Sequence, residues 1–342
     1  MYKHRKLRQR PRTILPYLIL SAVLILATTF TAHANTLPAA PAAPSDSVTI
    51  QGKWDITVVI NGKKSPSWLE IKHSGLRTLV GRFVGPGGSA RPISRIYLEN
   101  GKMSFSIPPQ WENDPDDLKV EGTLDGPDRL KGSMTFPNGN TYSWTAERAP
   151  TLRRKSAPVW GKPIHLFNGT NLNEWHAADA APSEWRNGKA NQWKVESGIL
   201  RSPHSGSNLV TNRTFDDFKL HIEFRYPKES NSGVYLRGRY EIQVIDSEGS
   251  EPSDVLLGGI YGFITPNEMI AKAPGEWQTF DITLVGRLVT VVANGKMIIC
   301  NQEIPGITGG AIDSNEGEPG PILLQGDHGP IDYRNIIITP AK

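Results

Sequence analysis

The sequence predicts an all-β protein with two domains: a small antiparallel β-barrel or sandwich, followed by a larger domain of two packed sheets. Short runs of alternating apolar and polar residues recur along the chain, and Gly, Pro and Asn turn signals separate them. No long segment has the helical period of 3.6 residues. Two proline-containing breaks, at 35–47 and 149–163, delimit the segments 48–148 and 164–342.

The first 34 residues have the organisation of a secretory signal peptide. Six basic residues precede an apolar run over 17–27, and Ala32-His33-Ala34 gives the small-x-small pattern of a cleavage site. The run is shorter than the roughly 20 residues that a membrane span needs. We therefore expect export to the periplasm or the exterior of a bacterial cell, with no stable membrane span after cleavage. An uncleaved N-terminal anchor is the alternative, and 35–47 is expected to be a flexible linker.

Charge argues against nucleic acid as the partner. The full chain has a formal net charge of +4, but removal of the signal leaves 32 basic against 34 acidic residues. The excess of positive charge therefore belongs to the targeting segment, and nothing specific for a polyanion remains in the mature chain.

The segment 48–148 is expected to form the small barrel or sandwich. Asn61-Gly62, a strong hairpin signal, follows the first run. Its tryptophans (Trp54, Trp68, Trp111 and Trp144) are interpreted as core residues. Eight runs at near-regular spacing predict its strands: Lys53–Ile60, Trp68–Lys72, Thr78–Val84, Ser94–Leu98, Lys102–Ile107, Leu118–Leu124, Leu130–Phe136 and Thr141–Glu147.

The segment 164–342 contains about a dozen further runs, which predict a sandwich or jelly roll of two packed sheets. Asn294-Gly295 is expected to join two of its strands in a tight hairpin. Cys300, the only cysteine, lies in an apolar arm of this hairpin and is interpreted as a small buried core residue.

Alternation places a set of polar side chains on one face of three consecutive strands. In 220–225, 234–237 and 240–244 the apolar residues are expected to face the core, and the intervening residues the opposite side. These intervening side chains include no lysine and form directional hydrogen bonds, which suits sugar hydroxyls and carbonyls. A solvated outer face is the alternative. The predicted binding face comprises Glu223, Arg225, Tyr235, Arg237, Glu241 and Gln243.

Loops at the ends of these runs add four candidates. Asn231 begins one strand, and Gln325 and His328 lie where another strand ends in a Gly-flanked Asp-His turn. His328 suits either metal ligation or proton transfer, although Asp-His-Gly is also ordinary turn chemistry. Asp246 ends the Glu241 strand, where it either joins the polar face or caps the turn.

Several ordered blocks resemble the 3-keto-disaccharide hydrolase family. The opening LFNGTNL with Trp175 and the WKVESGIL block come first, and the closing strand matches at Arg334-Asn335-Ile336. Between them, the matching blocks are FKLHIEFR, NSGVYLRG, YEIQVIDS, GEWQTFDIT and PILLQGDH, and the resemblance covers about 165–340. It implies a concanavalin A-like jelly roll whose sugar site lies on the concave sheet. The barrel lies outside the resemblance.

The resemblance also implies a reaction. Related glucanases place acidic residues at alternate positions of one strand, whereas here Gln243 stands between Glu241 and the out-of-phase Asp246, which disfavours the two-carboxylate mechanism. In a sugar oxidised at C3, the proton on C2 is acidic, so a base can start elimination of the C1 group, and water then adds. Glu223, Glu241 and Asp246 are the candidate bases or acids.

The remaining groups supply the other parts of that reaction. Arg225 and Arg237 would hold the oxyanion, and Tyr235 or His328 would protonate the leaving group. Asn231, Gln243 and Gln325 are expected to bind substrate. A divalent cation held by carboxylates and His328 is an alternative electrophile, and no metal ligands are assigned. Two other functions remain open: a non-catalytic, lectin-like carbohydrate-binding protein of the envelope, and an adhesion or scaffold factor.

Overall fold

The computed structural model describes residues 50–109, 115–178 and 190–342, and all of its named elements are strands. The predicted signal peptide, the linker over 35–47 and Trp111 lie outside the described residues. Residues Ala43–Lys342 form one compact unit. No described helix is long and apolar enough to cross a membrane.

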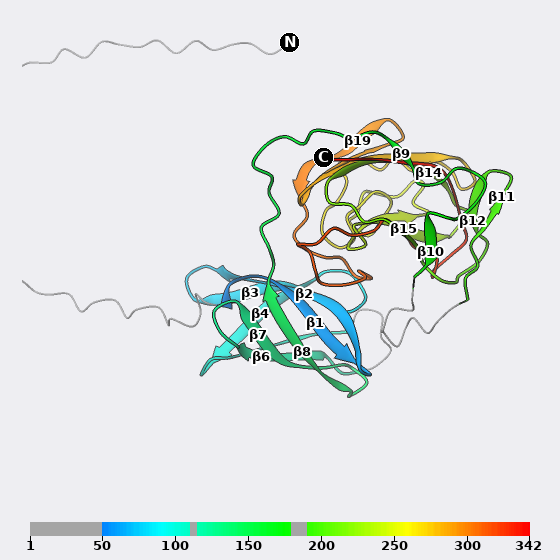
Figure 1. The fold of residues 1–342 in the computed structure, drawn as a ribbon. Helices are drawn as coiled ribbons and strands as arrows, with labels where there is room; N and C mark the ends of the chain where they lie inside the picture. The colour runs from blue at the N-terminus through cyan, green and yellow to red at the C-terminus, as the bar shows by residue number, and fades with distance from the viewer. Residues whose placement is uncertain (1–49, 110–114, 179–189) are drawn as a thin grey trace, which may run out of the picture. The chain divides into compact units, whose positions relative to one another are not determined.

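Strands β1 to β8 form a closed antiparallel barrel, as the sequence predicts (Figure 1). Each strand pairs with the next, and β1 closes the barrel by pairing with β8. Trp54 and Trp144 are buried in its core, which confirms their interpretation. The strands are β1 (Gly52–Ile60), β2 (Lys63–Ser74), β3 (Thr78–Val84), β4 (Arg91–Glu99), β5 (Lys102–Ile107), β6 (Leu118–Leu124), β7 (Arg129–Thr135) and β8 (Thr141–Arg148).

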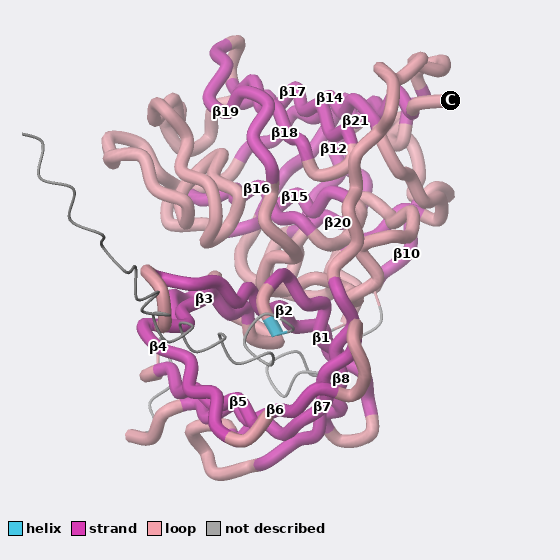
Figure 2. Tube along the Cα trace, turned by 90° about the vertical axis from the view of Figure 1, so that its left-hand side faces the viewer, coloured by secondary structure: helices cyan, strands magenta, loops and turns pink. Residues whose placement is uncertain are grey.

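The remaining strands form two antiparallel sheets that pack as a concanavalin A-like jelly roll (Figure 2). In strand order, the five-stranded sheet contains β10 (Trp175–Ala177), β13 (Leu209–Thr211), β20 (Leu323–Leu324), β15 (Asn231–Leu236) and β16 (Tyr240–Ile245). The eight-stranded sheet contains β11 (Lys194–Glu196), β12 (Ile199–Ser202), β21 (Ile331–Pro340), β14 (Phe218–Arg225), β17 (Gln278–Val285), β18 (Leu288–Ala293) and β19 (Lys296–Glu303), with β9 (Ile164–His165) also on β21.

Alternation in the central strands builds the core between the two sheets. Leu220, Ile222 and Phe224 of β14 are buried, and so are Val234 of β15 and Ile242 of β16, all within one hydrophobic cluster. Full burial of each such side chain contributes about 1.5–3 kcal/mol. The apolar faces of the two sheets therefore pack against each other, and their polar faces must point away from the shared core.

Cys300 is exposed, so its interpretation as a core residue is wrong. The pairing of β18 with β19 shifts register twice near Val291. As a result Ile298 and Ile299 are both buried in succession, and the alternation ends there, with residues 300–303 all exposed. The irregularity turns Cys300 outward.

The barrel and the jelly roll share buried contacts. Trp68 of β2 is fully buried, but it packs in the jelly-roll cluster rather than in the barrel core. Asp55 of β1 lies beside Glu316, a carboxylate that is wholly inaccessible and accepts hydrogen bonds from Tyr240 and Arg287. Burial and the charge of Glu316 raise the pKa of Asp55 to about 9, against the opposing effect of nearby arginines.

We expect Asp55→Asn to flatten the pH dependence of stability. Folded Asp55 retains a proton that the unfolded residue, with a pKa near 3.9, releases. Its favourable contribution is therefore complete only at low pH and declines by up to about 1.4 kcal/mol per unit as the pH rises towards 9. Asparagine cannot ionise, so the variant should have the higher melting temperature at pH 8. The exposed Asp116→Asn is the control, and equal slopes for the wild type and Asp55→Asn would contradict this assignment.

Candidate functional site

A row of side chains crosses the polar face of the five-stranded sheet. Tyr235 of β15 is the direct cross-strand partner of Glu241 on β16. Leu323 pairs with Tyr235 on the other side, and Val210 pairs with Leu323. Val210, Tyr235 and Leu323 form a small cluster separate from the main core. The row thus has an apolar end and an acidic end, and it faces away from the sheet-to-sheet core.

Tyr235 and Glu241 form the chemical centre of this row. Both side chains are almost completely buried, with 1% and 2% exposure. The Tyr235 hydroxyl lies 2.8 Å from Glu241 Oε2 and 2.9 Å from the carbonyl oxygen of Gly309. Both of these atoms accept hydrogen bonds when Glu241 is ionised, yet a hydroxyl has a single proton to donate. Protonation of Glu241 lets the carboxyl donate to Tyr235 while Tyr235 donates to Gly309, so the arrangement suits a carboxylate that gains and loses a proton.

Next to the row that contains Tyr235 and Glu241, a second row of cross-strand neighbours consists of Gln243, Gly233 and Gln325. This second row contributes groups that suit a hydroxylated ligand. Gln243 is paired with Gly233, and Gln325 donates its backbone N–H to the Gly233 carbonyl at 2.9 Å. Glycine is required at 233, because a Cβ there would lie 2.3 Å from Glu241 Oε1. Among the described residues, Gln325 Oε1 and Asn231 Oδ1 are buried oxygens without a hydrogen-bond partner. A buried acceptor left unsatisfied costs about 1–3 kcal/mol, which a ligand hydroxyl would recover.

Two flanking loops contain residues that the sequence patterns do not single out. Thr308 Oγ1 accepts the Glu241 N–H at 2.9 Å, and the N–H of Tyr261 donates to the Glu241 carbonyl at 3.1 Å. Burial, followed by the charges of Glu241 and Asp254, raises the pKa of Tyr261 to about 12, so its hydroxyl remains a proton donor. These residues lie in irregular segments, where alternation gives no signal. The sequence signal at these positions is the glycine that follows each residue, Gly262 after Tyr261 and Gly309 after Thr308. Such a glycine indicates a close approach of the backbone.

Asp327 and His328 lie in the loop that follows β20. His328 Nδ1 is 2.7 Å from Asp327 Oδ1, and the His328 side chain is about half exposed. The next residue, Gly329, approaches Asn231, since a Cβ on Gly329 would lie 3.0 Å from the Asn231 nitrogen. The backbone of this loop therefore passes the start of β15, one residue after an accessible imidazole.

Glu223 and Arg225 do not share a face with Glu241, contrary to the single polar face predicted from the sequence. Their strand, β14, belongs to the eight-stranded sheet, whose polar face points away from the core on the other side. Glu223 accepts hydrogen bonds of 2.6 Å from Arg334 and Asn335, and Arg225 donates to Asp332 at 2.6 Å. Partial burial would raise the pKa of Glu223, but the bonds from Asn335 and Arg334 outweigh it and lower the pKa.

Arg237 and Asp246 also lie apart from the Tyr235–Glu241 pair. Arg237 leaves β15 with a positive φ of 51° and donates to Tyr240, which faces the core and is adjacent to Glu241 in sequence. Its predicted orientation is therefore wrong, because alternation stops where the strand turns. Asp246 accepts the backbone N–H of Glu229 at 3.0 Å and so caps a turn.

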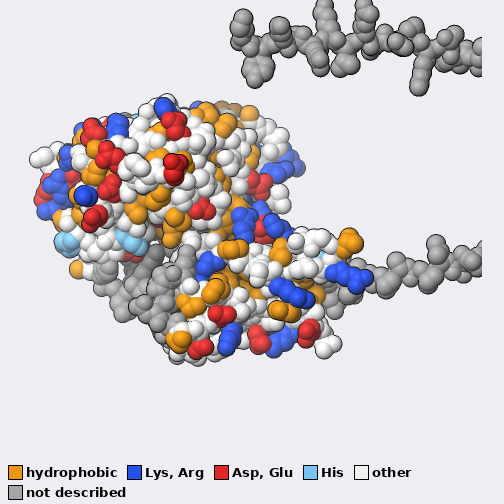
Figure 3. All heavy atoms as spheres, turned by 180° about the vertical axis from the view of Figure 1, so that it is seen from behind, with side chains coloured by type: hydrophobic (Ala, Val, Ile, Leu, Met, Phe, Trp, Pro, Cys, Tyr) orange, Lys and Arg blue, Asp and Glu red, His pale blue; other side chains and the backbone are white. Residues whose placement is uncertain are grey.

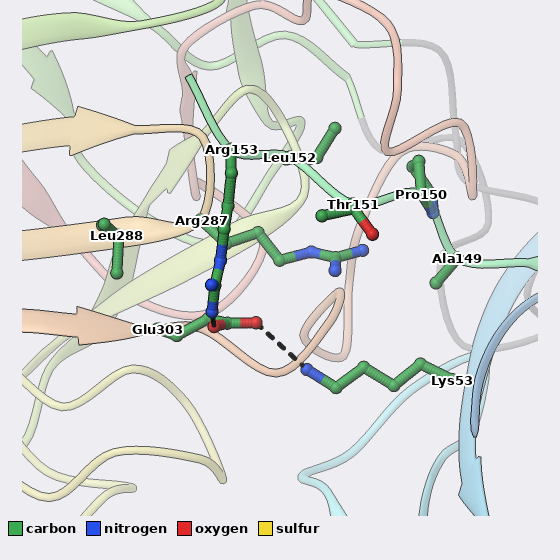
Figure 4. A pocket seen from close by; sticks show the side chains of 9 residues that line it. All are labelled: Lys53, Ala149, Pro150, Thr151, Leu152, Arg153, Arg287, Leu288 and Glu303. Carbon is green, nitrogen blue, oxygen red and sulfur yellow. Dashed lines mark hydrogen bonds and ion pairs between the residues drawn. The ribbon is translucent and has the colours of Figure 1, made fainter. Parts of the chain in front are cut away.

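A cavity of about 300 Å³ contains none of the predicted site residues (Figure 4). In it, Glu303 lies between Lys53 and Arg153 and forms an ion pair with each. Figure 3 shows acidic and basic side chains intermixed on the face that it displays. Within the part of the chain that the structure describes, no three His, Cys, Asp or Glu side chains gather as a metal site requires.

Comparison with known proteins identifies the family of the jelly-roll domain. Residues 162–339 match the family model of the 3-keto-alpha-glucoside-1,2-lyase-like domain. The chain belongs to this family. It is 27% identical over 104 residues to a 3-keto-disaccharide hydrolase of Bacteroides thetaiotaomicron, a match that covers 27% of this chain and 32% of that protein. The chain thus matches about a third of the length of this curated relative.

Solved structures with a similar chain trace include two of proteins from Parabacteroides distasonis ATCC 8503, provisionally described as glycosyl hydrolases. The first has 26% identity and a TM-score of 0.42, covering 56% of this chain and 96% of that one. The second has 17% identity and a TM-score of 0.42, covering 52% of this chain and 92% of that one.

We expect Glu223→Gln to lower stability without changing the Tyr235–Glu241 site. Loss of the charged bonds to Arg334 and Asn335 should lower the free energy of unfolding by about 1 kcal/mol at pH 7. Because the folded pKa of Glu223 lies below its ordinary value of about 4.3, this difference should shrink as the pH falls through that range. Urea denaturation at pH 7 and pH 3 measures it, with Glu121→Gln, an exposed ion-pair residue, as control. A difference that grows at pH 3 would contradict the assignment.

Proposed function

We propose that this protein cleaves 3-keto-glycosides, including 3-keto-disaccharides, by removing the proton on C2, eliminating the C1 leaving group and hydrating the product. The observation that carries the proposal is the buried Tyr235–Glu241 pair on the polar face of the five-stranded sheet, 2.8 Å apart. Membership of the 3-keto-alpha-glucoside-1,2-lyase-like family supports the substrate class.

Glu241 is proposed as the general base. Its carboxylate takes the proton from C2, which is acidic because C3 is a ketone, and the electron pair of the C2–H bond forms the enolate. As Glu241 becomes protonated it can donate to Tyr235, whose own proton then turns fully to the carbonyl oxygen of Gly309. The pair therefore accepts the proton without leaving a donor or acceptor unsatisfied.

Elimination then breaks the bond between C1 and the leaving oxygen. Collapse of the enolate forms the C1–C2 double bond, and the leaving oxygen takes a proton from an acid, for which His328, paired with Asp327, is the proposed group. Water then adds across the C1–C2 double bond: its hydroxyl joins C1, its other proton returns to His328, and the proton held by Glu241 returns to C2. The balance is net hydrolysis, with no oxidant consumed.

Amide side chains are proposed to orient the sugar. Gln325 Oε1 and Asn231 Oδ1 are buried acceptors for sugar hydroxyls. Gln243 Nε2 is the proposed donor to the C3 oxygen as negative charge develops on it, whereas Gln325 Nε2 lies 3.5 Å from the Tyr235 hydroxyl and donates to it. Arg225 and Arg237 are not included, because their contacts are with Asp332 and Tyr240.

A non-catalytic carbohydrate-binding protein is the second candidate function. It is favoured by the unsatisfied acceptors, which a bound sugar satisfies whether or not a bond is broken. The two functions differ in the role of Glu241, since binding uses it as a hydrogen-bond acceptor that glutamine can replace, whereas proton abstraction requires the carboxylate.

We also propose that the protein acts outside the cytoplasm of a bacterial cell. The basic and apolar N-terminal segment ending in Ala32-His33-Ala34 supports export. Fractionation of cells and determination of the mature N-terminus would test it, and an intact Met1 in the cytoplasmic fraction would contradict it.

We expect Glu241→Gln to reduce kcat on 3-keto-trehalose or 3-keto-glucosides by at least about 100-fold, because general base catalysis supplies roughly 10²–10⁴. Tyr235→Phe should reduce kcat by a smaller factor of about 10. Release of the leaving sugar measures both, with and without chelator and added divalent metals. Glu223→Gln is the matched carboxylate control and should retain kcat within about twofold.

Binding separates the two candidate functions. Calorimetry with a non-reactive sugar analogue should show that Glu241→Gln still binds within about tenfold of the wild type. Full wild-type binding with no turnover of any 3-keto-sugar would favour the non-catalytic function instead.

A further inference from the structure

The barrel contacts both loops that border the Tyr235–Glu241 pair. The first contact is backbone to backbone: a Cβ added to Gly309 would lie 1.9 Å from the carbonyl oxygen of Gly88, in the loop between β3 and β4. Gly309 is the residue whose own carbonyl accepts from Tyr235 at 2.9 Å. The barrel backbone is therefore in direct contact with Gly309, whose carbonyl accepts a hydrogen bond from Tyr235.

The second contact reaches the other loop that hydrogen-bonds to the backbone of Glu241. A Cβ on Gly262 would lie 2.5 Å from the nitrogen of Ala90, at the end of the same barrel loop. Gly262 follows Tyr261, whose N–H donates to the Glu241 carbonyl. The segment Gly88–Ala90 thus contacts the backbone of both loops that hydrogen-bond to the backbone of Glu241 on β16.

Side chains of the barrel extend these contacts. Trp68 meets the Phe263 ring edge-on with centroids 5.4 Å apart, and Arg82 lies over the same ring at 5.2 Å. Trp68 also packs so closely on Gly306 that a Cβ there would lie 2.2 Å from the indole. Trp68 is fully buried in the jelly-roll cluster. Its close packing therefore leaves both loops little freedom to move.

We propose that Gly88–Ala90 of the barrel is a positioning segment that holds the carbonyl of Gly309 against Tyr235 and thereby sets the basicity of Glu241. The inference rests on the proposed function for its catalytic consequence, but its structural content is independent of the reaction.

The position of Gly309 affects the basicity of Glu241 because the Tyr235 hydroxyl has a single proton to donate. When Gly309 is in place it competes with Glu241 for that proton, so the ionised carboxylate is stabilised less and is a stronger base. If the Gly309 carbonyl moves away, Tyr235 donates fully to Glu241, which stabilises the carboxylate, lowers its pKa and weakens it as a base.

Gly309→Ala in the full chain tests the inference. Its Cβ would collide with the barrel backbone, and Gly309 has no positive φ that would itself strain alanine. Gly87→Ala is the matched control, because it lies in the same barrel loop with nothing within 4 Å of its Cβ and no positive φ.

Two readouts are measured on each variant. Hydrogen exchange should rise at least about tenfold at the amides of Glu241, Tyr261 and Thr308 in Gly309→Ala, with no change in β18. With a 3-keto-glucoside, kcat should fall about tenfold, and the acidic limb of the pH profile of kcat/KM should move to lower pH by roughly half a unit or more. A uniform loss of activity at every pH, without the shift, would overturn the inference.

Trp68→Leu is the second variant, in case Gly309→Ala does not fold. It removes the indole from the jelly-roll cluster and leaves the barrel's own core intact. The same amides should exchange faster, while those of β6 and β7 do not. Variants that exchange like Gly87→Ala would overturn the inference even if the wild type is active. If the variants exchange faster at these amides but the wild-type protein turns over no 3-keto-sugar, the positioning role is supported. Only the proposed function is then refuted.

Discussion

The hydrogen bond between Tyr235 and Glu241 places the strongest constraint on this structure. A carboxylate with 2% exposure is costly unless its oxygens are hydrogen-bonded. The cross-strand Tyr235 donates a hydrogen bond to the carboxylate, the glycine at 233 makes room for it, and loop groups hold the backbone of Glu241 in place. Each of these features is understandable as support for one buried acid.

The two sheets put their charges to different uses. On the eight-stranded sheet, Glu223 and Asp332 are partly exposed and accept hydrogen bonds from arginines. The guanidinium carbons of Arg225 and Arg334 lie 4.7 Å and 3.9 Å from the centroid of the Trp277 ring. Such pairing lowers the pKa of a carboxyl and makes it a poor base. On the five-stranded sheet, Glu241 accepts a hydrogen bond from the neutral hydroxyl of Tyr235. The two sheets therefore hold their carboxylates in different surroundings.

The barrel lies outside the residues that match the family, yet it is packed into the same compact unit as the jelly roll. Asp55 and Glu316 show how closely the two are joined, because two carboxylates approach each other in a buried site where one must keep its proton. Backbone contacts at Gly309 and Gly262 reach the loops beside Glu241. A barrel attached only through a linker would have no need of such close approach.

The sequence by itself determined the all-β class, the eight barrel strands, the alternating burial of β14 and the family, because strand period, turn residues and ordered blocks are local signals. It also singled out Tyr235, Glu241, Gln243 and Gln325. Only the tertiary structure decided that Glu223 and Arg225 belong to the other sheet, since alternation defines two faces of each strand but not which sheet the strand joins. It likewise decided that Arg237 turns towards Tyr240, that Cys300 is exposed beyond a register shift, and that Thr308, Gly309 and Tyr261 border Glu241. Those positions depend on contacts between residues far apart in the chain, which no local period encodes.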